Sequence, residues 1–149
     1  MFKQEKGVTL VALVITIIVL LILAGVSIAM LTGDNGILTR ANDAKSKNSQ
    51  AEVLEKVNME LNAQLANAMA GYAFDSADKM KSNLGITTSK TDIAGYTVTV
   101  TGPEATGYDT TNTISIAITD PNSEFTTATG TVEYDSTSKV WKVTPVKAK

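Results

Sequence analysis

The feature that most constrains this chain is an apolar run from Val8 to Leu31, which is 24 residues without Asp, Glu, Lys, Arg, His, Asn or Gln. Only Thr9, Thr16 and Ser27 carry polar side chains within it. A helix of this length measures about 36 Å at 1.5 Å per residue, whereas the hydrocarbon core of a bilayer is about 30 Å thick. A helix also satisfies its backbone amides internally, as lipid requires. The run therefore predicts a membrane-spanning helix.

Two other interpretations compete with a retained membrane helix. The core helix of a soluble domain is disfavoured, because a domain of this size cannot bury so many uncharged residues. A secretory signal peptide has an apolar region of about 7–15 residues that ends at a small-residue cleavage site. Residues 27–29 (SIA) fit such a site, but Met30 and Leu31 continue the apolar pattern beyond it. We therefore expect a retained helix.

Charged residues on either side of the run predict its orientation. Lys3 and Lys6 precede it, whereas the other flank opens with Asp34 and has no basic residue before Arg40. Basic flanks tend to remain on the cytoplasmic side of a membrane. We expect a single-pass membrane protein whose N-terminus is cytoplasmic and whose remaining bulk lies outside.

The residue types that are missing exclude several classes of function. The chain contains neither Cys nor His, which excludes disulfides, thiolate metal sites and triads with an imidazole base. The net charge of −2 provides no concentrated positive footprint, so we expect no nucleic-acid partner. No glycine-rich phosphate loop follows a predicted strand. We expect no enzymatic activity and no cofactor.

Helix-breaking residues follow the apolar run at residues 32–36, where Gly33 and Gly36 bracket Asp34 and Asn35. We expect either a hinge or a plain juxtamembrane turn at this position. A second helix is predicted over residues 37–70, ending at Gly71. Its apolar stripe recurs at three and four residues and is expected to pack on a sheet. The stripe consists of Leu54, Val57, Leu61, Leu65, Ala68 and Met69.

The remaining residues predict a connecting loop over residues 71–94 and a sheet over residues 95–146. The loop contains a possible short helix at residues 75–84, with Ser76 as its N-cap. Apolar and polar residues then alternate with the period of a half-buried strand. The segments are YTVTV (96–100), TISIAI (113–118), TVEY (131–134) and KVWKVTPV (139–146), with a hairpin loop at YDSTSK (134–139). We expect three or four antiparallel strands and an α+β fold, with the domain spanning residues 37–149.

The stretch KQEKGVTLVALVITII (residues 3–18) resembles the N-terminus of type IV prepilins and pseudopilins. The resemblance consists of a charged leader that ends in glycine, an apolar residue, a Thr-Leu pair and a long apolar helix. It implies a leader at residues 1–7, cleavage after Gly7 by a prepilin peptidase, and methylation of the new amine of Val8. Thr9 and Leu10 form the motif pair. Residues 8–31 are then the membrane and filament-core helix.

Ala12 departs from the family pattern. The family usually has glutamate at this place, and that carboxylate faces the N-terminal amine of a neighbouring subunit. Ala12 cannot provide the charge, and the run from Val8 to Leu31 contains no other acid. A partner then supplies the carboxylate, or the subunit docks where none is needed, or packing alone is sufficient. In the simplest interpretation Ala12 is one more small apolar residue on a packed face.

The resemblance implies a structural subunit of a type IV pilus-like filament at the cell surface. Its partners would be copies of itself, other pilins, the prepilin peptidase, a membrane platform protein and a cytoplasmic assembly ATPase. One alternative is a minor pilin or pseudopilin of a secretion or DNA-uptake system. Another is a single-pass anchored surface domain that binds a ligand and does not polymerise.

One acidic loop is a weak candidate for calcium. Asp120, Asn122 and Glu124 place oxygen side chains at alternate positions in DPNSE. The glycine and the distant bidentate glutamate of a calcium-binding loop are missing. We therefore expect an ordinary surface turn at this position.

Overall fold

The structure, a computed structural model, describes residues 5–102, 109–119 and 125–149. For residues 5–8 it describes only the backbone. The chain divides into two compact units, the first ending at Ser46 and the second beginning with Lys47. The sequence instead places the start of the outer domain at residue 37.

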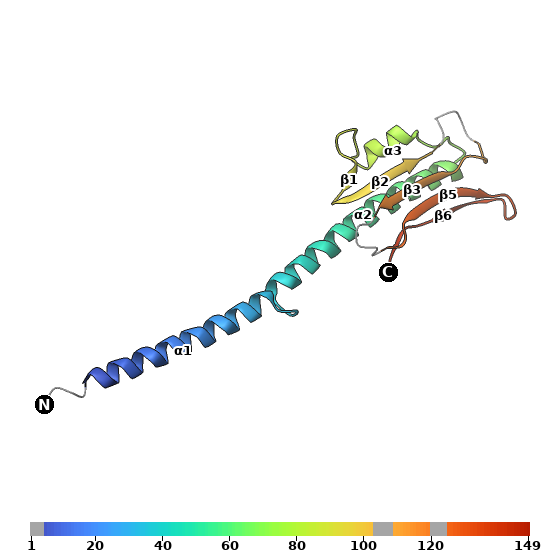
Figure 1. The fold of residues 1–149 in the computed structure, drawn as a ribbon. Helices are drawn as coiled ribbons and strands as arrows, with labels where there is room; N and C mark the ends of the chain where they lie inside the picture. Colours follow the sequence, from blue (N-terminus) through green and yellow to red (C-terminus); the bar gives the residue numbers. More distant parts are fainter. Residues whose placement is uncertain (1–4, 103–108, 120–124) are drawn as a thin grey trace. The chain divides into compact units, whose positions relative to one another are not determined.

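The apolar run forms helix α1, Glu5–Thr32, as the sequence predicts (Figure 1). α1 begins earlier than the expected helix and includes the last residues of the expected leader. A short break follows, and helix α2 then runs from Ile37 to Met69, against the expected bounds of 37 and 70. α2 ends where Gly71 adopts a left-handed conformation with φ of 76°, and the Gly71 N–H donates to the Ala68 carbonyl at 3.1 Å.

Within the second unit, α2 packs on one face of an antiparallel sheet (Figure 1). Val57, Leu61 and Ala68 are buried as predicted, and Leu54 and Leu65 are half-buried against the core. Met69 was expected in this stripe, but it is 72% exposed. The buried stripe also includes Val53, Glu60 and Gln64, which sequence periodicity did not include.

The main sheet has five strands in the order β1-β2-β3-β5-β6, all antiparallel, and a second sheet pairs β4 with β7. The prediction of three or four strands is therefore wrong in number, although the antiparallel α+β architecture is confirmed. The strands are β1 Asp92–Ile93, β2 Tyr96–Thr101, β3 Ile114–Thr119, β4 Phe125–Thr127, β5 Thr129–Asp135, β6 Val140–Thr144 and β7 Lys147–Ala148.

The alternation that predicts the strands also gives their buried face correctly. Tyr96, Val98 and Val100 of β2 are buried, whereas the threonines between them are exposed. The isoleucines of β3 are buried in the same way. These residues and the α2 stripe meet in a single core cluster. The period of two in the sequence therefore identifies the side of the sheet that α2 covers.

The segment predicted as a connecting loop contains two regular elements. Helix α3, Ala77–Asn83, lies inside the expected bounds, and the Ser76 hydroxyl caps it by accepting from the Lys79 N–H at 3.3 Å. β1 also lies in this segment and pairs with β2. The predicted hairpin loop is present between β5 and β6, where Lys139 has a φ of 57° and donates its N–H to the Asp135 carbonyl at 2.7 Å.

Candidate functional site

The most unusual surface of the chain is that of α1. Every described side chain of this helix, from Thr9 to Thr32, is exposed. The exposed fractions of its large apolar side chains run from 47% at Val14 and Val19 to 68% at Leu21 and Met30. None of the most apolar stretch of the helix is buried within the chain itself. No residue of α1 belongs to the hydrophobic core cluster of the described residues.

The apolar character of α1 extends around the whole helix. No charged residue occurs between Val8 and Thr32, so the helix has no polar face to turn toward water. A helix that is apolar on all sides is stable in a membrane or in the centre of a helical assembly. Burying each methylene is worth about 0.8 kcal/mol, so holding α1 in water would cost on the order of tens of kcal/mol.

Three of the four hydroxyl groups of α1 are satisfied by the helix itself. Thr16 donates to the Leu13 carbonyl at 2.8 Å, and Ser27 donates to the Leu23 carbonyl at 2.8 Å. Thr32 donates to the Ile28 carbonyl at 3.0 Å. These bonds to the preceding turn leave the three hydroxyls with no need of water as an acceptor. The polar residues of α1 are thus compatible with a dry environment.

Length and composition make this helical segment able to cross a bilayer. Within the described residues, no other helix is both long enough and apolar enough to cross a bilayer. This one lies near the N-terminus. The structure thereby gives the chain one potential membrane span.

The break between α1 and α2 is a closed, hydrogen-bonded turn. The Gly36 N–H donates to the Gly33 carbonyl at 2.6 Å, and the Thr39 hydroxyl donates to the same carbonyl at 3.1 Å. The Arg40 N–H donates to the Gly36 carbonyl at 3.0 Å, which begins the hydrogen bonding of α2. The Gly33 and Gly36 carbonyls thus both accept hydrogen bonds within the turn and the start of α2. Hinge motion at this position stays a prediction.

Both glycines of the break are required by close approach of the backbone. A Cβ on Gly36 would lie 2.7 Å from the Leu31 carbonyl oxygen and 2.8 Å from that of Gly33. A Cβ on Gly33 would lie 2.6 Å from the Ala29 carbonyl oxygen. By contrast, Gly25 in the middle of α1 has open space around it. The glycines that the sequence marks as helix breakers are therefore needed for steric reasons.

The other residues singled out from the sequence are distributed as follows. Gly7 and Val8 lie within the backbone of α1, and nothing in their geometry tests cleavage between them. Thr9, Leu10 and Ala12 lie on the exposed helix. The weak calcium candidates Asp120, Asn122 and Glu124 lie outside the described residues. Over the described ranges, no group of three acidic side chains is arranged to hold a metal ion.

A buried polar cluster on α2 was missed by sequence reasoning. Gln64 is fully buried, and its amide nitrogen donates to a carboxylate oxygen of Glu60 at 2.7 Å and to one of Asp75 at 3.0 Å. Its amide oxygen accepts the Asp75 N–H at 3.0 Å, and Asn83 donates to Glu60 at 3.2 Å. The cluster joins α2 to the segment before α3 and to the end of α3. Its members are satisfied by one another, which is how polar groups tolerate burial.

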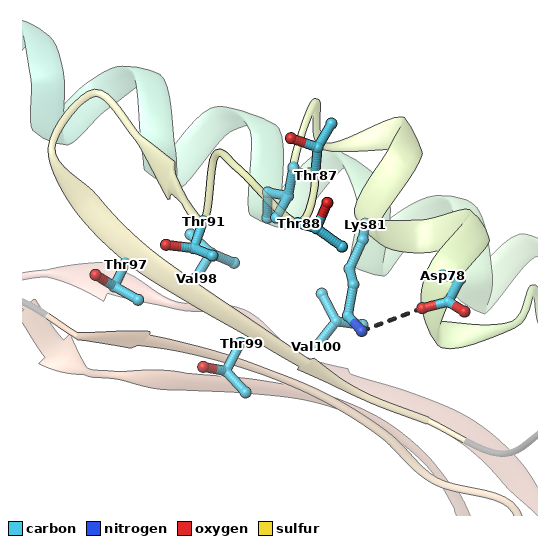
Figure 2. Close-up of a pocket in the computed structure, with 10 residues that line it drawn as sticks. Asp78, Lys81, Thr87, Thr88, Thr91, Thr97, Val98, Thr99 and Val100 are labelled. Carbon is cyan, nitrogen blue, oxygen red and sulfur yellow. Dashed lines mark hydrogen bonds and ion pairs between the residues drawn. The ribbon is translucent and has the colours of Figure 1, made fainter.

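A second surface feature is a groove between β2 and α3 (Figure 2). It has a volume of about 560 Å³, and its lining includes two charged side chains and five threonines. Lys81 donates to the Asp78 carboxylate at 3.2 Å, so the two charges are paired with each other. The sequence predicts α3 and β2 separately, but nothing in either segment indicates that they lie side by side.

The clearest electrostatic perturbation lies on the β5–β6 hairpin, away from this groove's lining. The Lys142 ammonium beside Asp135 holds the pKa of that carboxyl well below its usual range, helped by hydrogen bonds from Ser138 and Thr137. On a separate loop, hydrogen bonds from Thr111 lower the pKa of Asp109. Both carboxylates lie at the surface and accept hydrogen bonds within local turns. The two lowered pKa values therefore reflect interactions that stabilise surface loops, and they do not by themselves indicate a catalytic arrangement.

Comparisons with protein-family models, with curated proteins and with solved structures find no match to this chain. The family resemblance therefore rests on the N-terminal sequence.

Proposed function

We propose that this chain is a structural subunit of a type IV pilus-like surface filament, cleaved after Gly7 and assembled through α1. The observation that carries the proposal is α1 itself. It is apolar on every side and exposed along its described length, and it shares a chain with a folded α+β unit. The charged leader, Gly7 and the Thr9–Leu10 pair supply the resemblance to prepilins.

The proposal accounts for α1 with two dry environments. Before assembly the helix spans the bilayer, with Lys3 and Lys6 on the cytoplasmic side. After assembly it packs among the same helices of neighbouring subunits. Because exposing the helix to water would cost on the order of tens of kcal/mol, transfer between the two sites takes place at the membrane without a soluble intermediate. Small residues such as Gly25 permit close approach of helices.

The remaining partners follow from the resemblance. They are other pilins, a prepilin peptidase, a membrane platform protein and an assembly ATPase. The second unit would face the exterior, and its exposed threonines on β2 suit a solvated sheet surface. The subunit would have no enzymatic activity of its own.

Ala12 favours a second candidate, a minor pilin or pseudopilin of a secretion or DNA-uptake system. The expected acid is absent, and α1 has no acid after the cleavage position. A subunit that occupies a special place in the filament would not need the same charge pairing as its neighbours. The proportion of this chain in purified filaments separates the two candidates, since a major subunit would account for most of their mass.

A third candidate is an anchored surface domain that does not polymerise. The groove between β2 and α3 favours it, because a surface groove is the usual place for a ligand. Such a protein would remain a dispersed membrane monomer, whereas the proposed subunit would be recovered in fibres that are released by shearing.

Intact-mass analysis of sheared surface material tests the proposed function. The expected mass is that of the chain without residues 1–7 plus one methyl group. The matched controls are Gly7→Asp, which should remain unprocessed, and Gly25→Ala, which should be processed normally because Gly25 has open space around it. An unprocessed wild-type N-terminus would contradict the proposal. A soluble product cut near Ala29 would instead show that the run is a signal peptide.

A further inference from the structure

One edge of β2 is open over half of its length. On one side β2 pairs with β3 from Thr97 to Thr101. On the other side β1 pairs only with Tyr96 and Thr97, and the Val98 N–H donates to the Thr91 carbonyl at 3.1 Å. Within residues 5–102, 109–119 and 125–149, no strand lies beside Thr99 to Thr101 on this side. Among the described residues, β2 therefore presents an unpaired backbone edge beyond Val98.

The backbone groups on this edge can be identified from the alternation of an antiparallel strand. The N–H and C=O of one residue point to the same side, and those of the next residue point to the opposite side. Because the Val98 N–H points toward Thr91, the N–H and C=O of Val100 point to the same open side. Unpaired N–H and C=O groups on a sheet edge are a template for another strand. Val100 as a whole is only 6% exposed, so access to its backbone groups is through the groove that it lines.

The groove described above lies along this free edge. Four consecutive residues of β2, Thr97–Val100, line it, together with Thr87, Thr88 and Thr91 of the preceding loop. Figure 2 shows the Lys81 side chain reaching from α3 toward Val100, so that α3 and the loop form the wall opposite the strand. The groove between this wall and β2 has a volume of about 560 Å³. The stretch of β2 that lines the groove is roughly 10 Å long, at about 3.4 Å per residue.

We propose that this groove binds an extended, uncharged peptide segment from another polypeptide, which adds as a strand beside Val100. Main-chain hydrogen bonds to Val100 would provide affinity, and the groove walls would select the alternate side chains. The lining carries one cation and one anion, Lys81 and Asp78, and these are paired with each other. The remaining lining side chains are threonine, valine and isoleucine. Such a lining matches small polar and β-branched side chains rather than charged ones.

The opposite edge of the main sheet lacks these properties. β6 forms that edge, and it carries Lys142, with Lys139 immediately before it. Charged side chains, lysine above all, discourage the addition of a strand to an edge. β2 has no charged residue between Tyr96 and Thr101. The free edge of β2 is therefore the one suited to pairing.

This inference does not rest on the proposed function, because the groove lies wholly in the second unit. The test uses the full ¹⁵N-labelled chain in detergent micelles and a capped heptapeptide of alternating valine with serine or threonine. We expect saturable shift changes confined to Thr87–Thr91 and Thr97–Val100, and slower hydrogen exchange of the Val100 N–H. A peptide N-methylated at alternate residues should bind at least about tenfold more weakly, since it lacks main-chain donors.

Two protein variants complete the test. Thr88→Arg places a long charged side chain at an exposed position of the groove and should abolish binding. Thr137→Arg makes the same change on the exposed β5–β6 hairpin and should leave binding unchanged. The proposal is overturned if the peptide shifts no resonances at millimolar concentration, or if the N-methylated peptide binds equally well. It is also overturned if the Val100 N–H is already protected by self-association of the chain without peptide.

Discussion

The side-chain amide of Asn58 binds both backbone groups of Val146, which lies 88 residues further along the chain. The Asn58 amide nitrogen donates to the Val146 carbonyl at 2.9 Å, and its amide oxygen accepts the Val146 N–H at 3.0 Å. Val146 is buried, so water cannot easily replace these bonds. The Asn58 amide thus pairs with the Val146 backbone as a neighbouring strand would, and it links α2 to the segment that follows β6.

Replacing Asn58 should therefore weaken the second unit. Asn58→Ala leaves a buried N–H and a buried carbonyl without partners, which should lower the free energy of unfolding by roughly 2–4 kcal/mol. Asn62→Ala is the matched control, because Asn62 lies one turn further on α2 and bonds only to the Asn58 carbonyl of the same helix. Denaturant unfolding can be followed through Trp141, the single tryptophan of the chain. Equal effects of the two substitutions would contradict this role for Asn58.

A second prediction concerns the contact between α2 and β5. A Cβ on Gly130 would overlap with the Leu61 side chain and would lie 3.0 Å from the Thr144 carbonyl oxygen. Gly130→Ala should therefore cost about 1–3 kcal/mol of stability through overpacking. The cost should fall in the background of Leu61→Ala, which removes the overlapping methyl groups.

Gly102→Ala is the matched control for that prediction. Its added Cβ would lie 2.8 Å from the far end of the flexible Met80 side chain and 3.8 Å from Ile114, an ordinary contact, so a shift of the Met80 methyl group would be enough to accommodate it. The measurement is a double-mutant cycle from denaturant unfolding of the full chain in detergent micelles. Additive effects of Gly130→Ala and Leu61→Ala would show that Gly130 does not provide room for Leu61.

A third prediction concerns the turn between the helices. Gly36→Ala places a Cβ against two carbonyl oxygens, so the turn must rearrange and lose the bond from the Arg40 N–H. We expect faster hydrogen exchange at Gly36→Ala for the Arg40 N–H and its neighbours in the first turn of α2. Gly25→Ala should leave this exchange unchanged, because its Cβ points into open space. Unchanged exchange in both variants would show that the break does not require glycine.

The β5–β6 hairpin should show a defined dependence on pH. Because the pKa of Asp135 is lowered in the folded state, its charged form stabilises the protein at pH values above its unfolded pKa, near 3.8. That contribution is lost as the pH falls further, toward the lower folded pKa. Asp135→Asn should therefore be less stable than the wild type at pH 7, and the difference should shrink below about pH 4.

Asp135→Asn keeps an oxygen that accepts the Thr137 and Ser138 N–H groups, so the comparison isolates the charge that faces Lys142. Asp43→Asn, at an exposed position of α2, is the control because it removes a carboxylate that lies outside the hairpin. Thermal unfolding between pH 2 and pH 7 provides the measurement. A stability difference that persists unchanged at the acid end would exclude Asp135 as its source.

Sequence periodicity predicts the features of this fold that repeat along the chain. These are the alternation of buried and exposed residues in a strand and the buried stripe at every third or fourth residue of a helix. The alternation of Val98 and Val100 with threonine identifies the buried face of β2. The stripe of α2 is predicted less well, because Met69 is apolar but exposed and Gln64 is polar but buried. Gln64 is buried because Glu60 and Asp75 bond its amide, and such partners are not visible from spacing on one helix.

Features that depend on distant segments could not be predicted. β1 and β7 have two residues each, too few to show alternation, and they exist because β2 and β4 lie beside them. The groove between β2 and α3 could be predicted only if it were known which edge of the sheet remains unpaired. The length and apolar composition that would let α1 span a membrane, by contrast, are properties of consecutive residues, so they can be read from the sequence alone.

The central claim is that α1 passes from bilayer to filament without contact with water, and cysteine accessibility tests it directly. The chain contains no cysteine, so a single Leu20→Cys reports the middle of α1, and Ser136→Cys reports an exposed position of the hairpin. Intact cells, and filaments sheared from them, are treated with a membrane-impermeant maleimide. We predict labelling of Ser136→Cys in both states and of Leu20→Cys in neither. Labelling of Leu20→Cys in released filaments, or release of a dissolved chain that lacks α1, would contradict the account.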